Sequence, residues 1–140
     1  MNAAAAPTGE SLPPRARLRR KRDFQRVFQG GWRGGTRELR LVIRPNDLGY
    51  PRLGLAVGRK VGNAVVRNRM KRRLREVFRR ERALLAAPVD VVVIPQPGAA
   101  ALSFEALREQ LLRGMKAWRP RGRGPRENEP RRPAPQRADP

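Results

Sequence analysis

The sequence of 140 residues contains neither cysteine nor histidine. The absence of cysteine excludes disulfide bonds, thiolate zinc sites and cysteine nucleophiles. The absence of histidine removes the most common general base and the most common metal ligand. Acidic residues are few, and they form no carboxylate pair suited to catalysis; a glycine-rich phosphate loop and an activated serine are also missing. The sequence therefore predicts no catalytic side chains, and any chemistry is expected to come from a partner.

Basic residues, by contrast, are abundant: 33 lysines and arginines against 12 acids give a formal net charge of +21. Such an excess repels itself in a compact fold unless a polyanion neutralises it. Nucleic acid is the favoured partner. An anionic membrane surface is the alternative, although the apolar runs are far too short to span a bilayer. Residues 1–10 show no signal-peptide pattern, so we expect a cytoplasmic protein that does not bind membranes.

The length allows one domain with one hydrophobic core. Residues 119–140 hold seven arginines, three acids and six of the 14 prolines. Such a segment buries too little apolar surface to offset the entropy of ordering it. We therefore predict a folded domain over residues 17–118, a disordered arm over 1–16 and a disordered basic tail over 119–140.

Hydrophobic periodicity predicts the element order α-β-β-α-β-α, which corresponds to an α+β sandwich with one small mixed sheet covered by helices. Side chains that accept hydrogen bonds at helix N-termini mark where the helices begin. The expected elements are a short helix capped by Asp23 and ended by Gly30, strands over 38–44, 52–58 and 89–94, a helix from Asn63 to about Ala86, and a helix that begins at Ser103.

Two apolar patterns leave alternatives open. Gly54, Ala56 and Gly58 share one face of the strand over 52–58, which suits the close approach of another molecule's backbone and equally the packing of a helix. Phe24 and Phe28 share one helical face. Such a pair usually belongs to a core, but aromatic rings beside basic residues also stack on unpaired bases. Both interpretations of the phenylalanines allow partial exposure.

The most informative segment is the basic stretch from residue 59 to residue 82, with 11 lysines and arginines against two glutamates. Arg67 and Arg69 fall in the first turns of a predicted helix, where the helix dipole already supplies positive charge. A bound phosphate reverses this disadvantage, because free N–H groups and guanidinium groups then converge on one anion. The shortage of acids leaves few i,i+4 ion pairs, so anion binding is favoured over a merely solvated face.

The stretch GLAVGRKVGNAVVRNRMKRRLREVF, within residues 53–78, closely resembles the family of bacterial ribonuclease P protein components. Upstream, RKRDFQRVFQGG over residues 20–31 is similar to the N-terminal helix of that family. The likeness covers roughly residues 17–118. Rival classes fit less well: a general RNA-binding protein does not need both motifs, and a protein-only nuclease needs a carboxylate cluster.

The resemblance implies an accessory subunit of ribonuclease P, an endoribonuclease that removes the 5′ leader of precursor tRNA. The catalyst in this family is an RNA subunit, and Mg²⁺ is held mainly by that RNA and the substrate. The protein is expected to be a monomer bound one to one with the RNA. The implied fold is like domain 2 of ribosomal protein S5, with a left-handed βαβ crossover against the usual right-handed rule.

The resemblance also carries over two sets of site residues. The residues expected to bind the catalytic RNA are Arg59, Lys60, Asn63, Arg67, Asn68, Arg69, Lys71, Arg72 and Arg75. The residues expected to bind the leader are Phe24, Phe28, Arg20, Lys21, Leu41, Ala56 and Gly58. Family members often carry an aromatic residue in the first strand, near positions 39–42. This chain has none there, so an apolar contact is expected to replace one stacking partner.

Overall fold

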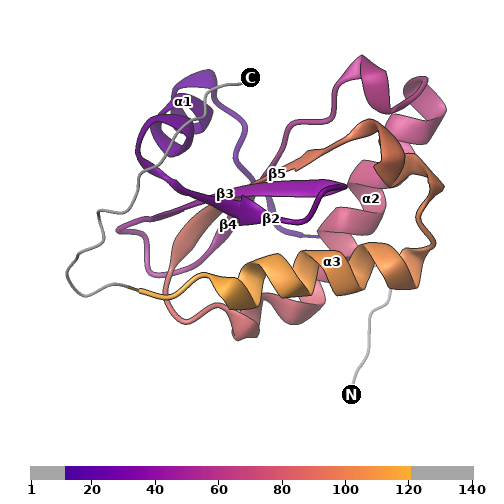
Figure 1. Ribbon diagram of the computed structural model, residues 1–140. Coiled ribbons are helices and arrows are strands. Elements are labelled where there is room, and N and C mark those ends of the chain that lie inside the picture. Colours follow the sequence, from indigo (N-terminus) through magenta and orange to yellow (C-terminus); the bar gives the residue numbers. More distant parts are fainter. Residues whose placement is uncertain (1–11, 121–140) are drawn as a thin grey trace.

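A computed structural model describes residues 12–120 of the chain. Within this part, three α-helices and four strands form one domain (Figure 1). The strands are β2 (Trp32–Gly35), β3 (Leu39–Pro45), β4 (Arg52–Leu55) and β5 (Val89–Pro95). The helices are α1 (Lys21–Gly30), α2 (Ala64–Glu81) and α3 (Phe104–Ala117). Short 3₁₀ segments are η1 (Pro14–Ala16), η2 (Arg59–Val61), η3 (Arg82–Leu84) and η4 (Pro97–Ala101).

The four strands form one mixed sheet in the order β2-β3-β5-β4. β2 pairs with β3 and β3 pairs with β5 in antiparallel fashion, whereas β4 and β5 are parallel. Because parallel neighbours need a crossover connection, α2 links β4 to β5 outside the plane of the sheet. The predicted α+β sandwich with a small mixed sheet is confirmed.

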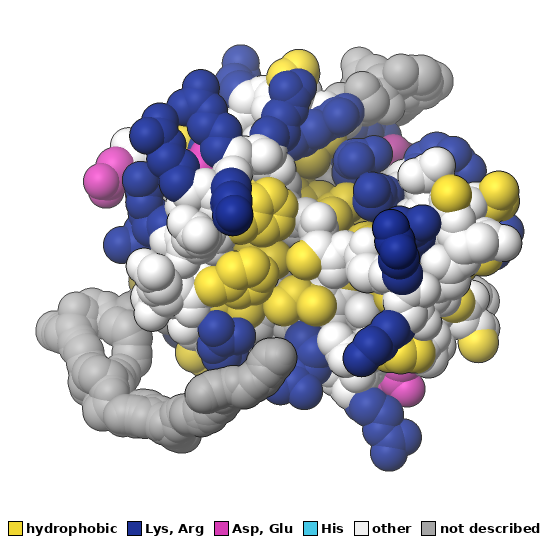
Figure 2. All heavy atoms as spheres, turned by 90° about the horizontal axis from the view of Figure 1, so that it is seen from above, with side chains coloured by type: hydrophobic (Ala, Val, Ile, Leu, Met, Phe, Trp, Pro, Cys, Tyr) yellow, Lys and Arg dark blue, Asp and Glu magenta, His cyan; other side chains and the backbone are white. Residues whose placement is uncertain are grey.

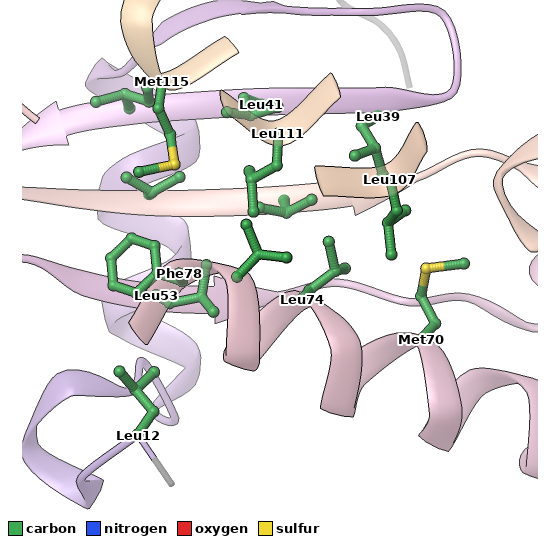
Figure 3. Packing of buried hydrophobic residues seen from close by; sticks show 14 of the residues in the cluster. Leu12, Leu39, Leu41, Leu53, Met70, Leu74, Phe78, Leu107, Leu111 and Met115 are labelled. Atoms are coloured by element: carbon green, nitrogen blue, oxygen red, sulfur yellow. The ribbon is translucent and has the colours of Figure 1, made fainter. Parts of the chain in front are cut away.

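The main hydrophobic core lies between the sheet and the pair of helices α2 and α3, whereas α1 lies on the opposite face of the sheet (Figure 1). Figure 3 shows Leu74 and Phe78 of α2 and Leu107 and Leu111 of α3 directed toward the strands. These side chains recur at three- and four-residue intervals, so each helix presents one apolar stripe to the sheet. The hydrophobic periodicity that predicted these two helices therefore corresponds to the faces they turn toward the core.

Both predicted caps of the longer helices are present. The Asn63 side chain accepts a hydrogen bond from the Val66 amide at 3.0 Å, and Ser103 Oγ accepts one from the Ala106 amide at 3.1 Å. The cap predicted for the first helix is wrong, because Arg20 occupies the N-cap position of α1 without a side-chain bond and Asp23 lies in the first turn.

The sequence did not predict β2. Its residues, WRGG, lack the alternation of a half-buried strand, and two glycines weaken intrinsic strand preference. The strand forms because β3 offers a complete edge: Trp32 pairs with Ile43 and Gly35 with Arg40. The observed element order is therefore α-β-β-β-α-β-α. No helix within residues 12–120 meets the length and hydropathy that a membrane span requires.

Three predicted boundaries also move. Helix α2 ends at Glu81, before Ala86, and the chain continues as η3. Strand β4 ends at Leu55, although the Ala56 amide still donates to the Val93 carbonyl at 2.9 Å. The folded part begins before residue 17, since Leu12 is only 1% exposed and lies in the main core near Phe78 (Figure 3). Residues 1–11 and 121–140 lie outside the described part, so disorder there stays a prediction.

The segment after η1 closes one edge of the sheet. Arg17 forms an isolated parallel bridge with Leu53, and the Leu18 amide donates to the Leu53 carbonyl at 2.8 Å. β4 is an edge strand, and these contacts satisfy part of its free hydrogen-bonding side. The chain then enters α1 on the face opposite the main core, which sets the position of the helix that carries Phe24 and Phe28.

Candidate nucleic-acid interface

A second, smaller apolar cluster lies beneath α1. Leu18, Val27, Val42 and Val92 are buried in it. Half-buried side chains that pack on this cluster form the apolar band, which consists of Phe24, Phe28, Ala56 and Ile94. Figure 2 shows apolar side chains in the middle of this face with lysines and arginines on both sides. An apolar surface framed by cations suits a ligand that has flat apolar rings and negative charges.

The two phenylalanines of α1 contact each other, with ring centroids 6.4 Å apart and ring planes at 36°. Both rings pack on the cluster beneath α1, and both remain half-buried. Their predicted partial exposure is confirmed. Arg20 and Lys21 lie exposed where α1 begins, on the same helix as the two rings.

The face that carries Gly54, Ala56 and Gly58 was expected either to pack against a helix or to let another molecule's backbone approach. The structure gives these positions different surroundings. A Cβ at Gly54 would lie 2.8 Å from Leu18 Cδ1 and 2.9 Å from Phe24 Cε1. The bare backbone there is needed for close packing beneath α1. Beyond the end of β4, a Cβ at Gly58 would meet no atom within 4 Å, and Ala56 is half-buried. Packing therefore uses Gly54, and Ala56 and Gly58 remain accessible.

The assignment of Leu41 to a leader-binding surface is wrong. Leu41 is 1% exposed and belongs to the main core on the other face of the sheet. A Cβ at Gly114 of α3 would lie only 2.9 Å from Leu41 Cδ2, which shows how closely α3 covers it. Because side chains alternate along a strand, the neighbour Val42 points toward α1 instead. Val42 is itself buried in the cluster beneath α1.

The residues predicted to bind the catalytic RNA lie in η2, in the loop that follows it and in the first three turns of α2. Arg67 is partly held in place, because its Nε donates to the Gly62 carbonyl at 3.1 Å. Asn63 uses its side-chain oxygen for capping. Arg59, Lys60, Asn63, Asn68, Arg69 and Arg72 are exposed, whereas Arg67, Lys71 and Arg75 are half-buried.

The basic half of α2 lacks acidic partners. In the described part of the chain, no cation between positions 59 and 75 forms a salt bridge. Burial and the nearby cation Arg17 lower the pKa of Arg75. The N-terminal end of the helix adds its own partial positive charge. These uncompensated charges favour a bound polyanion.

The last turns of α2 differ, because Glu76 lies 2.8 Å from the Arg79 guanidinium and 2.5 Å from that of Arg80. The hydrogen bond from Arg79 is the main cause that lowers the pKa of Glu76 below its ordinary value of 4.5. A carboxylate whose pKa is lower in the folded than in the unfolded state stabilises the fold at pH values above its unfolded-state pKa. This stabilisation is lost as the pH falls through the folded-state pKa.

We therefore expect Glu76→Gln to flatten the pH dependence of stability below pH 4.5, the ordinary value of the group. Urea unfolding at a series of pH values from neutral to acidic measures this dependence directly. Parallel curves for the variant and the wild-type protein would contradict the assigned ion pair.

The position of α1 depends on a buried ion pair beneath its first turn. Asp90, the one buried charged residue among residues 12–120, accepts hydrogen bonds from Arg52 Nε at 2.9 Å and Arg52 Nη2 at 2.8 Å. Asn46 Nδ2 donates to the same carboxylate at 2.8 Å. The Arg52 guanidinium also lies 3.7 Å from Asp23 of α1. The network thus ties α1 to β4 and β5.

Three arginines on the α1 side of the sheet were not predicted as site residues. Arg40 and Arg44 alternate with the buried leucines and isoleucine of β3, so the alternation in the sequence could have indicated them. Arg33 lies on β2, which the sequence did not predict, and no sequence signal marked it. Its Nη2 donates to the Phe28 carbonyl at 2.9 Å.

Comparison with known proteins agrees with this architecture. A family model described as Ribonuclease P matches residues 12–119. The chain is 39% identical over 111 residues to the ribonuclease P protein component of Thermotoga maritima, covering 76% of this chain and 95% of that protein. It is 43% identical over 100 residues to that of Syntrophobacter fumaroxidans, covering 71% of this chain and 84% of that protein.

Solved structures of the same kind are similar in fold. The ribonuclease P protein from Thermotoga maritima aligns with a TM-score of 0.69 at 36% identity, over 74% of this chain and 98% of that one. The protein from Staphylococcus aureus aligns with a TM-score of 0.68 at 29% identity, over 73% and 94% of the two chains. The family model, the relatives and the fold agree, and the chain belongs to the ribonuclease P protein family.

Proposed function

We propose that this protein is the RNA-binding subunit of ribonuclease P and binds both the catalytic RNA and the 5′ leader of precursor tRNA. The observation that carries the proposal is the arrangement of one face of the molecule. There, two half-exposed aromatic rings lie on an apolar band, and cations without acidic partners lie beside it. Because the chain belongs to the ribonuclease P protein family, we propose that this surface acts within a ribonucleoprotein enzyme.

Each part of the surface has a distinct task in this proposal. The cations of η2 and α2, from Arg59 to Arg75, bind phosphates of the catalytic RNA. The leader lies along the apolar band, where Phe24 and Phe28 stack on unpaired bases and Ala56 and Gly58 let its backbone approach. Arg20 and Lys21 attract its phosphates. Stacking and phosphate contacts tolerate many sequences, as a set of precursors with different leaders requires.

Metal chemistry in this proposal belongs to the RNA. No group of three or more carboxylates or other strong metal ligands comes together in residues 12–120. The only buried carboxylate in that range, Asp90, is already bonded to Arg52 and Asn46. We therefore propose that Mg²⁺ is held mainly by the RNA subunit and the substrate, where it supplies the hydrolytic chemistry. This chain contributes binding and orientation.

The test of the function is cleavage of a precursor tRNA by the purified full-length protein, with and without the cognate RNA subunit. We expect removal of the leader only when the RNA subunit and Mg²⁺ are present. At limiting Mg²⁺ we expect faster cleavage with the protein than with the RNA alone. Cleavage by the protein alone, or no effect of the protein on the RNA-catalysed reaction, would overturn the proposal.

Phe24→Ala should weaken binding of precursor tRNA to the holoenzyme by about 1–3 kcal/mol, the usual contribution of one base stacked on an aromatic ring. Binding of mature tRNA, which has no leader, should not change. Equilibrium titration of the reconstituted holoenzyme with both RNAs measures the difference.

The matched control is Phe104→Ala, which also truncates a half-buried phenylalanine but lies on α3 against the main core. It should affect thermal stability without a preference for precursor over mature tRNA. Equal losses of affinity for the two RNAs in the Phe24 variant would count against a leader contact.

A further inference from the structure

We propose that the leader continues past the apolar band onto a basic patch formed by Arg33 and Arg40, which binds leader phosphates farther from the cleavage site. This extension rests on the proposed function, because it assumes that the leader lies along the apolar band. It assigns a binding role to two residues of β2 and β3 that lie outside the basic segment of α2 and outside α1.

The sheet register places the patch where the apolar band ends. Arg40 of β3 pairs with Ile94 of β5, and Ile94 is itself part of the apolar band. On the other side Arg40 pairs with Gly35 of β2, which has no side chain to cover it. Arg33 pairs with Val42, whose side chain lies in the cluster beneath α1. Both arginines are exposed on the α1 side of the sheet.

The patch lies at the opposite end of the band from the surface proposed for the catalytic RNA. Gly58 and Arg59 lie three and four residues past the end of β4, which forms one edge of the sheet, whereas β2 forms the other edge. Adjacent strands are about 4.8 Å apart, so a leader crossing from β4 to β2 traverses about 15 Å. Nucleotides near the cleavage site then lie beside the catalytic RNA, and more distant nucleotides reach Arg40 and Arg33.

The electrostatics of the patch favour a bound anion. Neither arginine forms a salt bridge anywhere in the described range. Burial and then the neighbouring charge of Arg40 lower the pKa of Arg33. Two cations held near each other without a counter-ion repel, and a phosphate between them removes the repulsion. The phosphate backbone of a single-stranded leader is therefore the occupant that matches the charge of this surface.

A purely structural role can explain Arg33 but not Arg40. Arg33 bonds to the Phe28 carbonyl near the end of α1, which stabilises that helix end. The side chain of Arg40 makes no hydrogen bond or salt bridge to any residue between 12 and 120. Its guanidinium is free to bind a ligand, so substitution of Arg40 tests binding without removing a contact of the fold.

The experiment measures the affinity of the reconstituted holoenzyme for precursor tRNAs whose leaders are lengthened one nucleotide at a time. In the wild-type holoenzyme, affinity should rise with each added nucleotide until the leader has passed β2. Arg40→Ala should bind the shortest leaders normally and the longest about fivefold more weakly, as expected for one exposed ionic contact. For long leaders, the logarithm of its binding constant should fall less steeply with the logarithm of the salt concentration. The slope should decrease by about 0.7 for each lost phosphate contact.

Two further variants sharpen the result. Arg40→Lys keeps the charge and should retain most of the affinity for long leaders. Arg113→Ala, which removes an exposed arginine from α3 on the other side of the molecule, should behave like the wild-type protein at every leader length. Thermal melting of each variant shows whether the fold is intact.

The possible failures are distinguishable. If the wild-type holoenzyme shows no leader-dependent affinity at all, both the proposed function and the extension are overturned. If the wild-type holoenzyme depends on leader length and Arg40→Ala follows it unchanged, only the extension is overturned. An equal loss for short and long leaders would also overturn the extension, because it would place Arg40 near the cleavage site or in the RNA-subunit interface.

Discussion

Reversing both Arg67 and Arg69 to glutamate is expected to weaken assembly with the catalytic RNA by about 100-fold or more. Each arginine lies in the first turns of α2, beside the positive end of the helix dipole, and neither has an acidic partner within residues 12–120. A hydrogen bond to a charged group contributes about 1.5–3 kcal/mol. Two lost contacts therefore correspond to about 3–6 kcal/mol, or at least about two orders of magnitude in the dissociation constant.

Binding of the variant to the RNA subunit is measured by filter retention or calorimetry at one fixed salt concentration, because phosphate contacts are strongly salt-dependent. The matched control is the double variant Arg113→Glu, Lys116→Glu. It changes the net charge equally but alters exposed residues of α3. The control should lose much less affinity. Equal losses would mean that net charge alone, rather than the position of the cations, determines assembly.

Arg67 and Arg69 also differ in a way that separates binding from folding. The Nε of Arg67 bonds to the Gly62 carbonyl, so its substitution disturbs the loop before α2, whereas Arg69 is exposed. The single variant Arg69→Glu should lose about half of the binding free energy that the double variant loses. Its melting temperature should not change. Normal assembly of the double variant with the RNA would refute the RNA-binding role of this segment.

Arg52→Met is expected to lower the free energy of unfolding by about 3–5 kcal/mol, the typical effect of removing one partner of a buried ion pair. Asp90 is 4% exposed and accepts two hydrogen bonds from Arg52. Without the guanidinium, Asn46 Nδ2 remains as the side-chain donor to a buried carboxylate. For a domain of this size the melting temperature should fall by more than about 10 °C.

The double variant Arg52→Met, Asp90→Val is the control for this interpretation. Replacing both partners of a buried pair by apolar side chains is often nearly neutral, because no charge is left without a counter-ion. We therefore expect most of the lost stability to return, as measured by thermal and urea unfolding. A single variant as stable as the wild-type protein, or a double variant no better than the single one, would show that the pair does not stabilise the fold.

The most reliable sequence-based predictions were those that depend on neighbours along the chain. Asn63 and Ser103 cap their helices because a cap involves only the next three residues. The hydrophobic periodicity that predicted α2 and α3 depends only on residues three and four apart, and these residues pack in the main core. The cap assigned to Asp23 is wrong because α1 already begins at Lys21, which places Asp23 inside the first turn. There Asp23 lies near Arg52, a contact that is not visible in the sequence.

Predictions that depend on pairing across the chain were weaker. Alternation along a strand places Leu41 and Val42 on opposite faces of β3, but it cannot tell which face lies toward α1. That choice follows from the register of β3 with β5 and from the side on which α1 and α3 pack. Strand β2 was missed because its own residues carry no strand pattern and it forms by pairing with the edge of β3. Leu12 was missed because it packs against residues distant in the sequence.

The sequence by itself determined the chemical character of this protein. The net charge of +21 and the basic motif of residues 59–75 predict binding of a polyanion, and the lack of histidine and cysteine leads us to expect no catalytic side chains. Composition and local spacing are sufficient for that conclusion. Only the tertiary structure decided which residues share a surface. Because the faces of a sheet depend on long-range pairing, the fold alone brings Phe24 beside Ala56 and Ile94, and places Arg40 at the end of that band.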